Sequence, residues 1–304
     1  MKLWERYHTP TTVDEAVALL QQYAGTARII AGGTDLLVEM REGHHDPFPA
    51  LIDITSIPSL RTIQIEKDTV YIGAGVAHTP IVKNPVLVER ATCLVESCGV
   101  IGGPQVRNVG TLGGNVAHAL PAGDGTTSLV ALDAEVEIFK NGKRRWVNIL
   151  EMFTGPGQSL LDSTRDVLLQ FRFRLSGKNE ATAFKRIMRP QGVALPILGC
   201  AVWVRLDESR EYFDMVRVCI APIAPTPTRI SELEEVLKGQ PANEVSIQKA
   251  VDTGLKVVHP RTSKYRATAE YRQEMMELLL RRTLPLAIER ARTGKAIPEG
   301  VGLK

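Results

Sequence analysis

Two glycine-rich stretches, Ala31-Gly32-Gly33-Thr34-Asp35-Leu36 and Gly110-Thr111-Leu112-Gly113-Gly114-Asn115, indicate the fold that this sequence encodes. Each follows a segment with the pattern of ordered structure, and glycine lets bare backbone N–H groups approach an anionic, extended ligand. A single Gly-Gly pair after a strand is usually a simple turn. Two such loops, followed by Asp124 in Pro121-Ala122-Gly123-Asp124-Gly125, predict a pyrophosphate that lies between them.

The composition excludes several classes of protein. The chain has 304 residues, long enough for two or three domains, and its 37 basic and 34 acidic residues leave a net charge of only +3. Such a balance gives no reason to expect nucleic acid as a partner. The N-terminus has no apolar core of a secretory signal, and the longest apolar stretch, around 195–204, is too short to span a bilayer. We therefore expect a soluble cytoplasmic protein that does not bind membranes.

The residues before position 57 predict a small α/β unit. Thr12 and Glu15 have the spacing of a capping box, which marks the start of a helix with an apolar stripe. Ile57-Pro58 breaks the pattern and ends the unit. The elements expected here are a helix over 12–23 and strands over 28–31 and 50–54.

The rest of the chain predicts antiparallel strands and a helical end. Strands are expected over 62–66, 69–72, 135–139, 145–147, 167–173, 183–187, 199–206 and 216–220, the last four forming an antiparallel set by their short links. Helices are expected over 86–97, 128–132, 231–237, 245–257 and 269–291. We assign the α+β class and divide the chain into residues 1–57, 58–177 and 178–304.

Several catalytic and metal-binding motifs are missing from the sequence. The first glycine stretch lacks the Gly-Lys-Ser/Thr of a P-loop. Gly73-Ala74-Gly75 lacks the third glycine of a Rossmann fingerprint, so we interpret this second motif as structural. The 6 histidines and 4 cysteines show no metal-ligand spacing, and the cysteines are interpreted as reduced, buried thiols. No nucleophile elbow is present. We predict no metal site and no catalytic acid, base or nucleophile.

Taken together, residues 31–36, residues 101–115 and Asp124 resemble the FAD-binding medium subunit of the molybdenum hydroxylases. That family includes the flavoproteins of carbon monoxide dehydrogenase and of bacterial xanthine dehydrogenases. The resemblance continues through Ile223-Ala224-Pro225-Thr226-Pro227 and Ala269-Glu270-Tyr271-Arg272, so it covers nearly the whole chain. It implies a two-subdomain FAD-binding domain of the PCMH type, followed by a three-stranded antiparallel sheet with a three-helix bundle.

The resemblance also implies a set of FAD contacts. The first loop would wrap the pyrophosphate with its backbone N–H groups, and the second would contact the pyrophosphate and the ribityl chain from the other side. Asp124 would hydrogen-bond the cofactor, Ile101 would lie near the flavin or adenine, and Leu168 and Lys185 would lie beside the isoalloxazine ring. The full set is Ile29, Ile30, Ala31, Gly32, Gly33, Thr34, Asp35, Leu36, Ile101, Thr111, Gly114, Asn115, His118, Asp124, Leu168 and Lys185.

The sequence departs from the family pattern at two places. Many relatives carry Arg-x-x-Asp-x-Ala after the lysine strand, whereas residues 189–194 here read Arg-Pro-Gln-Gly-Val-Ala and lack the aspartate. His118 stands where a small residue or threonine is usual. No cysteine-bearing insertion follows Asn115, so no iron–sulfur cluster is expected in this chain.

The resemblance implies an electron-transfer function. Electrons would come from a [2Fe-2S] small subunit and pass through FAD to NAD or another acceptor, while a molybdopterin large subunit hydroxylates the substrate. Two alternatives stay open: a non-redox nucleotide-binding or assembly module with the same fold, and a stand-alone flavin oxidase of the vanillyl-alcohol type. The short chain, without an obvious substrate domain, argues against the oxidase.

Overall fold

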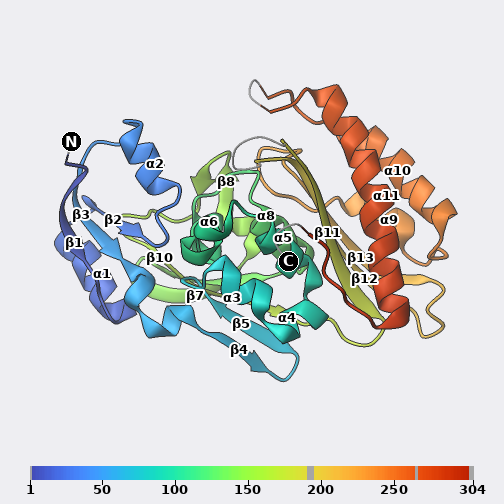
Figure 1. Ribbon diagram of the computed structural model, residues 1–304, viewed down its shortest axis with the longest axis horizontal. Coiled ribbons are helices and arrows are strands. Elements are labelled where there is room, and N and C mark those ends of the chain that lie inside the picture. The colour runs from blue at the N-terminus through green and yellow to red at the C-terminus, as the bar shows by residue number, and fades with distance from the viewer. Residues whose placement is uncertain (1, 190–194, 264–265, 301–304) are drawn as a thin grey trace.

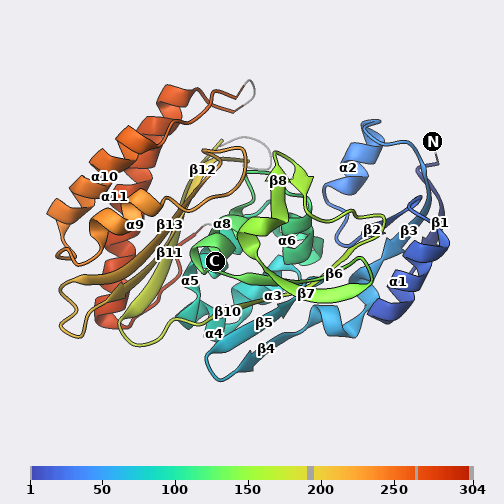
Figure 2. The ribbon, with the colours of Figure 1, turned by 180° about the vertical axis from the view of Figure 1, so that it is seen from behind.

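The computed structural model describes residues 2–189, 195–263 and 266–300, and its three larger β-sheets follow one another along the chain (Figure 1). The N-terminal and C-terminal sheets lie at opposite ends of the molecule, with the third sheet and a group of short helices between them (Figures 1 and 2). Of the segment 189–194, in which the family aspartate is missing, only Arg189 lies within the described residues.

The N-terminal unit is a parallel sheet with the strand order β1-β3-β2. Its predicted helix and two predicted strands are confirmed, whereas β1 was not predicted because only its two end residues are even partly buried. Thr12 Oγ1 accepts the N–H of Glu15 at 3.1 Å, but the Glu15 carboxylate accepts the N–H of Thr11 instead of Thr12. The elements are β1 (Trp4–His8), α1 (Val13–Gln22), β2 (Ala27–Ile30), α2 (Leu36–Arg41) and β3 (Phe48–Asp53).

The central sheet is antiparallel, with the order β4-β5-β10-β6-β7. The predicted hairpins are confirmed, and Asn141 and Gly142 both have positive φ in the turn between β6 and β7. β10 pairs with β5 and β6 and so does not join the three strands that follow it. The strands are β4 (Ile63–Glu66), β5 (Thr69–Gly73), β6 (Glu135–Lys140), β7 (Lys143–Asn148) and β10 (Val167–Arg174), with a separate hairpin of β8 (Phe153–Gly155) and β9 (Gln158–Ser159).

Six short helices accompany the central sheet. The helix predicted over 86–97 is two helices, because the backbone at Ala91 leaves the helical conformation. All residues of α5 and α8 are buried, since both helices pack against the C-terminal sheet. The helices are α3 (His78–Lys83), α4 (Pro85–Arg90), α5 (Thr92–Gly99), α6 (Pro104–Val109), α7 (Leu112–Ala117) and α8 (Asp124–Ala131).

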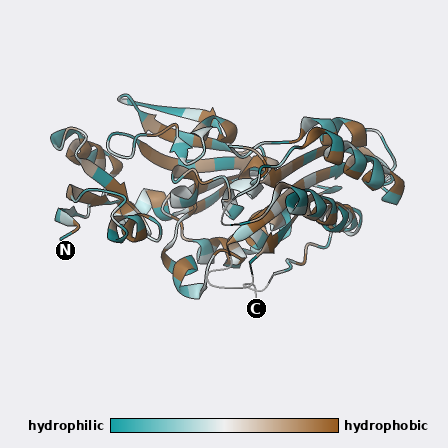
Figure 3. Cartoon of the chain, turned by 90° about the horizontal axis from the view of Figure 1, so that it is seen from above, coloured by the Kyte–Doolittle hydropathy of each residue, from teal (hydrophilic) through white to brown (hydrophobic). Residues whose placement is uncertain are grey.

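The C-terminal unit is the predicted three-stranded antiparallel sheet with three helices. The longest helix, α11, packs on β11 and β12, while α5 and α8 pack against the same sheet, so nearly every residue of β12 is buried. Hydrophobic residues accordingly run along these strands (Figure 3). The elements are β11 (Glu180–Met188), β12 (Pro196–Leu206), β13 (Phe213–Ala221), α9 (Ser231–Leu237), α10 (Glu244–Val257) and α11 (Ala269–Thr293).

The four cysteines are free and buried, as the sequence predicts. Burial raises the pKa of the Cys93 thiol to about 12. Within the described residues, none of the helices combines the length and the apolar character needed to cross a membrane.

Candidate cofactor site

A cavity of about 660 Å³ lies between the two glycine-rich stretches. This volume falls within the range of about 300–1,000 Å³ that is usual for ligand and cofactor sites. The cavity draws its walls from the N-terminal unit, the central helices, β9, β10 and β11. Every residue of the predicted cofactor set lines it except Lys185. The fold therefore brings the two loops and Asp124 to one place, although they are distant in sequence.

The first loop presents free backbone donors. It joins β2 to α2, and the N–H groups of Gly32, Gly33, Thr34 and Asp35 donate no hydrogen bond to any residue that the structure describes. Gly33 has a φ of +67°, which side-chain-bearing residues rarely adopt. Consecutive free amides that border a cavity form a concave site for an anion.

The second loop differs in part from the expectation, because most of its amides are already used, although the N–H of Thr111 has no acceptor among the described residues. The N–H of Leu112 donates to Val76 O and that of Gly113 to Ala74 O, both at 3.0 Å. The N–H of Gly114 donates to Thr111 Oγ1 at 2.9 Å, which caps α7. The second loop can therefore offer a ligand its side chains, a close approach and the single amide of Thr111, but not the run of consecutive free amides that the first loop has.

Glycine at position 32 allows the two loops to touch. A Cβ atom there would lie 2.2 Å from the carbonyl oxygen of Val109, far inside van der Waals contact. At Gly114, by contrast, a Cβ would meet only Thr111 Oγ1, at 3.1 Å. Gly32 thus serves the contact between the loops, whereas Gly114 keeps space open beside Thr111.

Asp124 is buried in the cavity wall at the start of α8 and pairs with Arg186 of β11. Arg186 Nη1 lies 2.5 Å from Asp124 Oδ2, and the two side chains are only 6% and 5% exposed. Burial raises the pKa of Asp124 to about 6, although the charge of Arg186 acts in the opposite direction. The Arg186 Nε finds no acceptor in the described part of the chain, so this pair is buried without full hydrogen bonding.

Lys185 does not reach the cavity. Successive side chains of a strand point to opposite faces of a sheet, and Arg186 takes the cavity side. The ammonium group of Lys185 instead forms an ion pair with Glu299, beyond the end of α11. The cation in the cavity wall at this strand is therefore Arg186.

His118 belongs to a polar bridge among residues that line the cavity. Its Nε2 lies 3.4 Å from Glu39 Oε1 of α2, and Glu39 Oε2 lies 3.0 Å from His45 Nε2. Glu39 thus connects the end of the second loop with the segment that follows the first. Among the described residues, no group of three or more His, Cys, Asp or Glu side chains is arranged to hold a metal ion.

Comparison with known proteins identifies the family. Residues 3–173 match the FAD binding domain in molybdopterin dehydrogenase, and residues 182–287 match the CO dehydrogenase flavoprotein C-terminal domain. The chain belongs to this family of FAD-binding subunits. Its cofactor is FAD, and the subunit belongs to the oxidoreductases.

Relatives match this FAD-binding subunit over most of their length. The carbon monoxide dehydrogenase medium chain of Hydrogenophaga pseudoflava is 32% identical over 281 residues, which span 92% of this chain and 96% of the relative. The xanthine dehydrogenase FAD-binding subunit of Escherichia coli O157:H7 is 30% identical over 288 residues, which span 94% of this chain and 96% of the relative. A solved structure of carbon monoxide dehydrogenase from Hydrogenophaga pseudoflava superposes with a TM-score of 0.88 at 31% identity and covers 95% of this chain and 99% of that chain.

The FAD-binding subunit also has cavity residues that sequence reasoning missed. Arg28, Arg186 and Arg266 all line the cavity, and burial lowers the pKa of Arg28 and of Arg266. Arg28 adjoins the first loop and Arg186 adjoins Lys185, so their proximity to predicted residues was a usable signal. Arg266 comes from the segment before α11, and no local pattern marks it.

Proposed function

We propose that this chain is the electron-transfer subunit of a molybdenum-containing hydroxylase or dehydrogenase. It would take electrons from a [2Fe-2S] partner subunit and pass them through FAD to NAD or another acceptor, while a molybdopterin subunit carries out the hydroxylation. The cavity between the two loops is the observation that carries this proposal. FAD supplies the redox chemistry, and the chain binds and orients it.

The residues of the cavity fit an extended dinucleotide. The free amides of Gly32–Asp35 would bind the pyrophosphate oxygens, because they have no other acceptor among the described residues. Thr111 and Asn115 would bind the cofactor from the second loop through their side chains. Ile101 and Leu168 add apolar lining for a ring, and Leu168 is 6% exposed.

Replacement of Gly32 and Gly114 by valine tests whether FAD binds in the cavity between the two loops. The double variant Gly32→Val/Gly114→Val should purify without FAD while the C-terminal domain stays folded, because one side chain separates the loops and the other fills the cavity. Of the two single variants, Gly32→Val should have the larger effect, since its Cβ would clash with backbone. Flavin absorbance after denaturation and circular dichroism measure the two outcomes.

Gly177→Val is a suitable control. A Cβ at Gly177 would meet Glu180 Oε2 at 3.6 Å, an ordinary contact, and Gly177 does not line the cavity. This variant should retain FAD. Stoichiometric flavin in the double variant would contradict the assignment of the site.

The electron route needs a separate measurement. The flavin-loaded chain, mixed with its reduced [2Fe-2S] partner, should lose its flavin absorbance, and NAD or another acceptor should restore it. A chain that never binds flavin would instead be the non-redox module. Substrate turnover by the chain alone would indicate the stand-alone oxidase.

A further inference from the structure

A second hollow, of about 440 Å³, lies at the junction of the central and C-terminal sheets. Its walls come from β5 and β10 on one side and from β12 and β13 on the other, and none of its residues lines the FAD cavity. Three arginines line it, Arg172, Arg174 and Arg217, against the two carboxylates of Asp133 and Glu135. We call it the arginine hollow.

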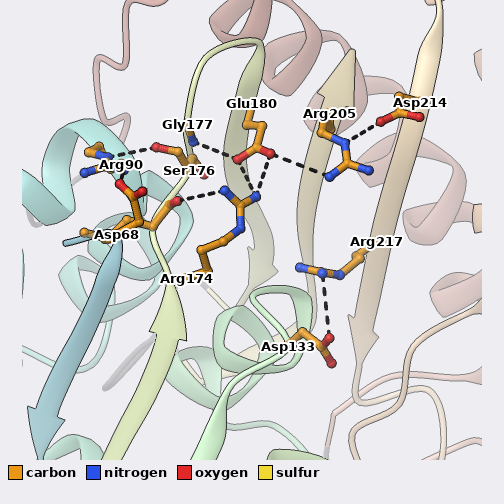
Figure 4. Close-up of polar contacts among 11 residues, drawn as sticks. Asp68, Arg90, Asp133, Arg174, Ser176, Gly177, Glu180, Arg205, Asp214 and Arg217 are labelled. Carbon is orange, nitrogen blue, oxygen red and sulfur yellow. Dashed lines mark hydrogen bonds and ion pairs between the residues drawn. The ribbon is translucent and has the colours of Figure 1, made fainter. Parts of the chain in front are cut away.

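Arg217 is the cation with the most unused hydrogen-bonding capacity here. Its guanidinium carbon lies 4.4 Å from the ring centroid of Trp203, a side chain that is 1% exposed, so the aromatic ring holds it in place. Arg217 donates no hydrogen bond to any residue within the described ranges. Its partner carboxylate, Asp133 Oδ2, is 3.7 Å away, beyond hydrogen-bond distance (Figure 4).

Arg174 approaches the same ring, with its guanidinium carbon 5.9 Å from the Trp203 centroid. Its Nη2 is held by both carboxylate oxygens of Glu180, at 2.6 Å each. Arg174 and Arg217 come from β10 and β13 and both line the hollow, where Arg174 is directed at Glu180 and Arg217 at Asp133 (Figure 4). Two guanidinium groups are thus held near one buried ring by separate strands.

Arg217 has weaker charge compensation than the other arginines here, because Arg172, Arg174 and Arg229 each have a hydrogen-bonded carboxylate, in Glu135, Glu180 and Glu234. Burial lowers the pKa of Arg217, and the nearby charges of Arg229 and Arg174 act in the same direction. The charges of Asp133 and Glu234 oppose this effect on the pKa of Arg217, but Asp133 also faces Arg229, whose Nη1 lies 3.6 Å from Asp133 Oδ1. An anion beside Arg217 would relieve the repulsion among these cations and accept the donors that Arg217 leaves free.

We propose that the arginine hollow binds a phosphate group, with Arg217 as its principal ligand and Arg174 as a second cation. The planar fork of a guanidinium matches the oxygens of a phosphate. The phosphate comes either as the free ion or as the phosphoryl group of a nucleotide. This inference does not depend on the proposed electron route.

Calorimetric titration of the FAD-loaded full chain tests the proposal, with inorganic phosphate in one arm and AMP in the other. The wild type should bind phosphate saturably, and Arg217→Gln should weaken binding by about tenfold or more, because a charged hydrogen-bond donor is lost. Arg217→Lys keeps the charge but not the fork and should fall between the two. Tighter binding of AMP than of phosphate would identify a nucleotide as the source.

Arg205→Gln is the matched control. Arg205 also approaches Trp203, at 5.8 Å, but it pairs with Asp214 and does not line the hollow. This variant should bind within about twofold of the wild type, since no phosphate ligand is lost. Absence of saturable binding to the wild type in both arms, or equal losses in Arg217→Gln and Arg205→Gln, would overturn the proposal. Flavin content checks that each variant is folded.

Discussion

His78 shows how a single residue can set an acid limit on stability. It is 2% exposed at the start of α3, it lines the FAD cavity, and its Nδ1 has no partner among the described residues. Burial lowers the pKa of His78 from 6.5 to about 4, and the charge of Arg107 adds to the shift. The folded protein therefore keeps this imidazole neutral at pH values where the unfolded chain protonates it.

The lowered pKa of His78 makes the stability of the folded protein depend on pH. A lowered histidine pKa means that the unfolded state binds more protons between pH 6.5 and about 4, so stability falls as the pH decreases through this range. His78→Leu should remove up to about 1.4 kcal/mol of this loss per pH unit. Urea unfolding of the FAD-loaded wild type and of the FAD-loaded His78→Leu variant, at several pH values between neutral and mildly acidic, measures this pH dependence of the free energy of unfolding. Parallel curves for the two proteins would show that His78 does not contribute.

At the scale of the element, the short helix α7 has an N-terminal cap that also borders the cofactor cavity. The helix spans only Leu112–Ala117, and Thr111 Oγ1 accepts the N–H of Gly114. The same threonine, 4% exposed, lines the FAD cavity. One side chain thus orders the second loop and is part of the cofactor wall.

Thr111→Ala should therefore reduce both stability and FAD affinity. Loss of an N-cap costs about 1 kcal/mol. Thr12 caps α1 in the same way, at 3.1 Å from the N–H of Glu15, but it does not line the cavity. Thr12→Ala should lower the melting temperature by a similar amount and leave FAD affinity unchanged, which thermal unfolding and flavin titration can check. Equal FAD affinities in the two variants would contradict a role of Thr111 in binding.

At the scale of the whole molecule, Glu96 of α5 joins the central and C-terminal units. Arg290 Nη2 of α11 lies 2.6 Å from Glu96 Oε1, with exposures of 3% and 1%. The carboxylate also accepts the N–H of Phe184 from β11 and that of Glu299, which follows α11. A single buried carboxylate thus contacts three separate parts of the C-terminal unit.

Glu96→Gln should destabilise the junction strongly. Removing one partner of a buried ion pair costs about 3–5 kcal/mol, because the other charge stays buried without compensation. The partly exposed pair of Glu277 and Arg281 on α11 provides the comparison, and Glu277→Gln should cost less than about 1 kcal/mol. Chemical denaturation of both variants gives the two values. Similar losses would mean that the Glu96 pair does not hold the units together.

Short-range patterns were sufficient to predict most elements of the fold. Capping at Thr12, alternation in the strands and the Asn141-Gly142 turn act within a few residues, so each can be read without its tertiary surroundings. The same holds for the two glycine loops, whose composition marks them directly. The division into helices α4 and α5 was harder to predict from the sequence. Helix α5 is buried on all sides and shows no polar face that would reveal its boundaries.

Short-range patterns could not predict the contacts between residues that are distant in sequence. A run of free amides remains in the first loop but not in the second, because Ala74 and Val76, from another part of the chain, accept the N–H groups of Gly113 and Leu112. Arg186, and not Lys185, faces the cavity, where it pairs with Asp124 at the start of α8. Spacing along the chain identifies candidates, whereas the packing of the sheets decides which side chains and amides face a ligand.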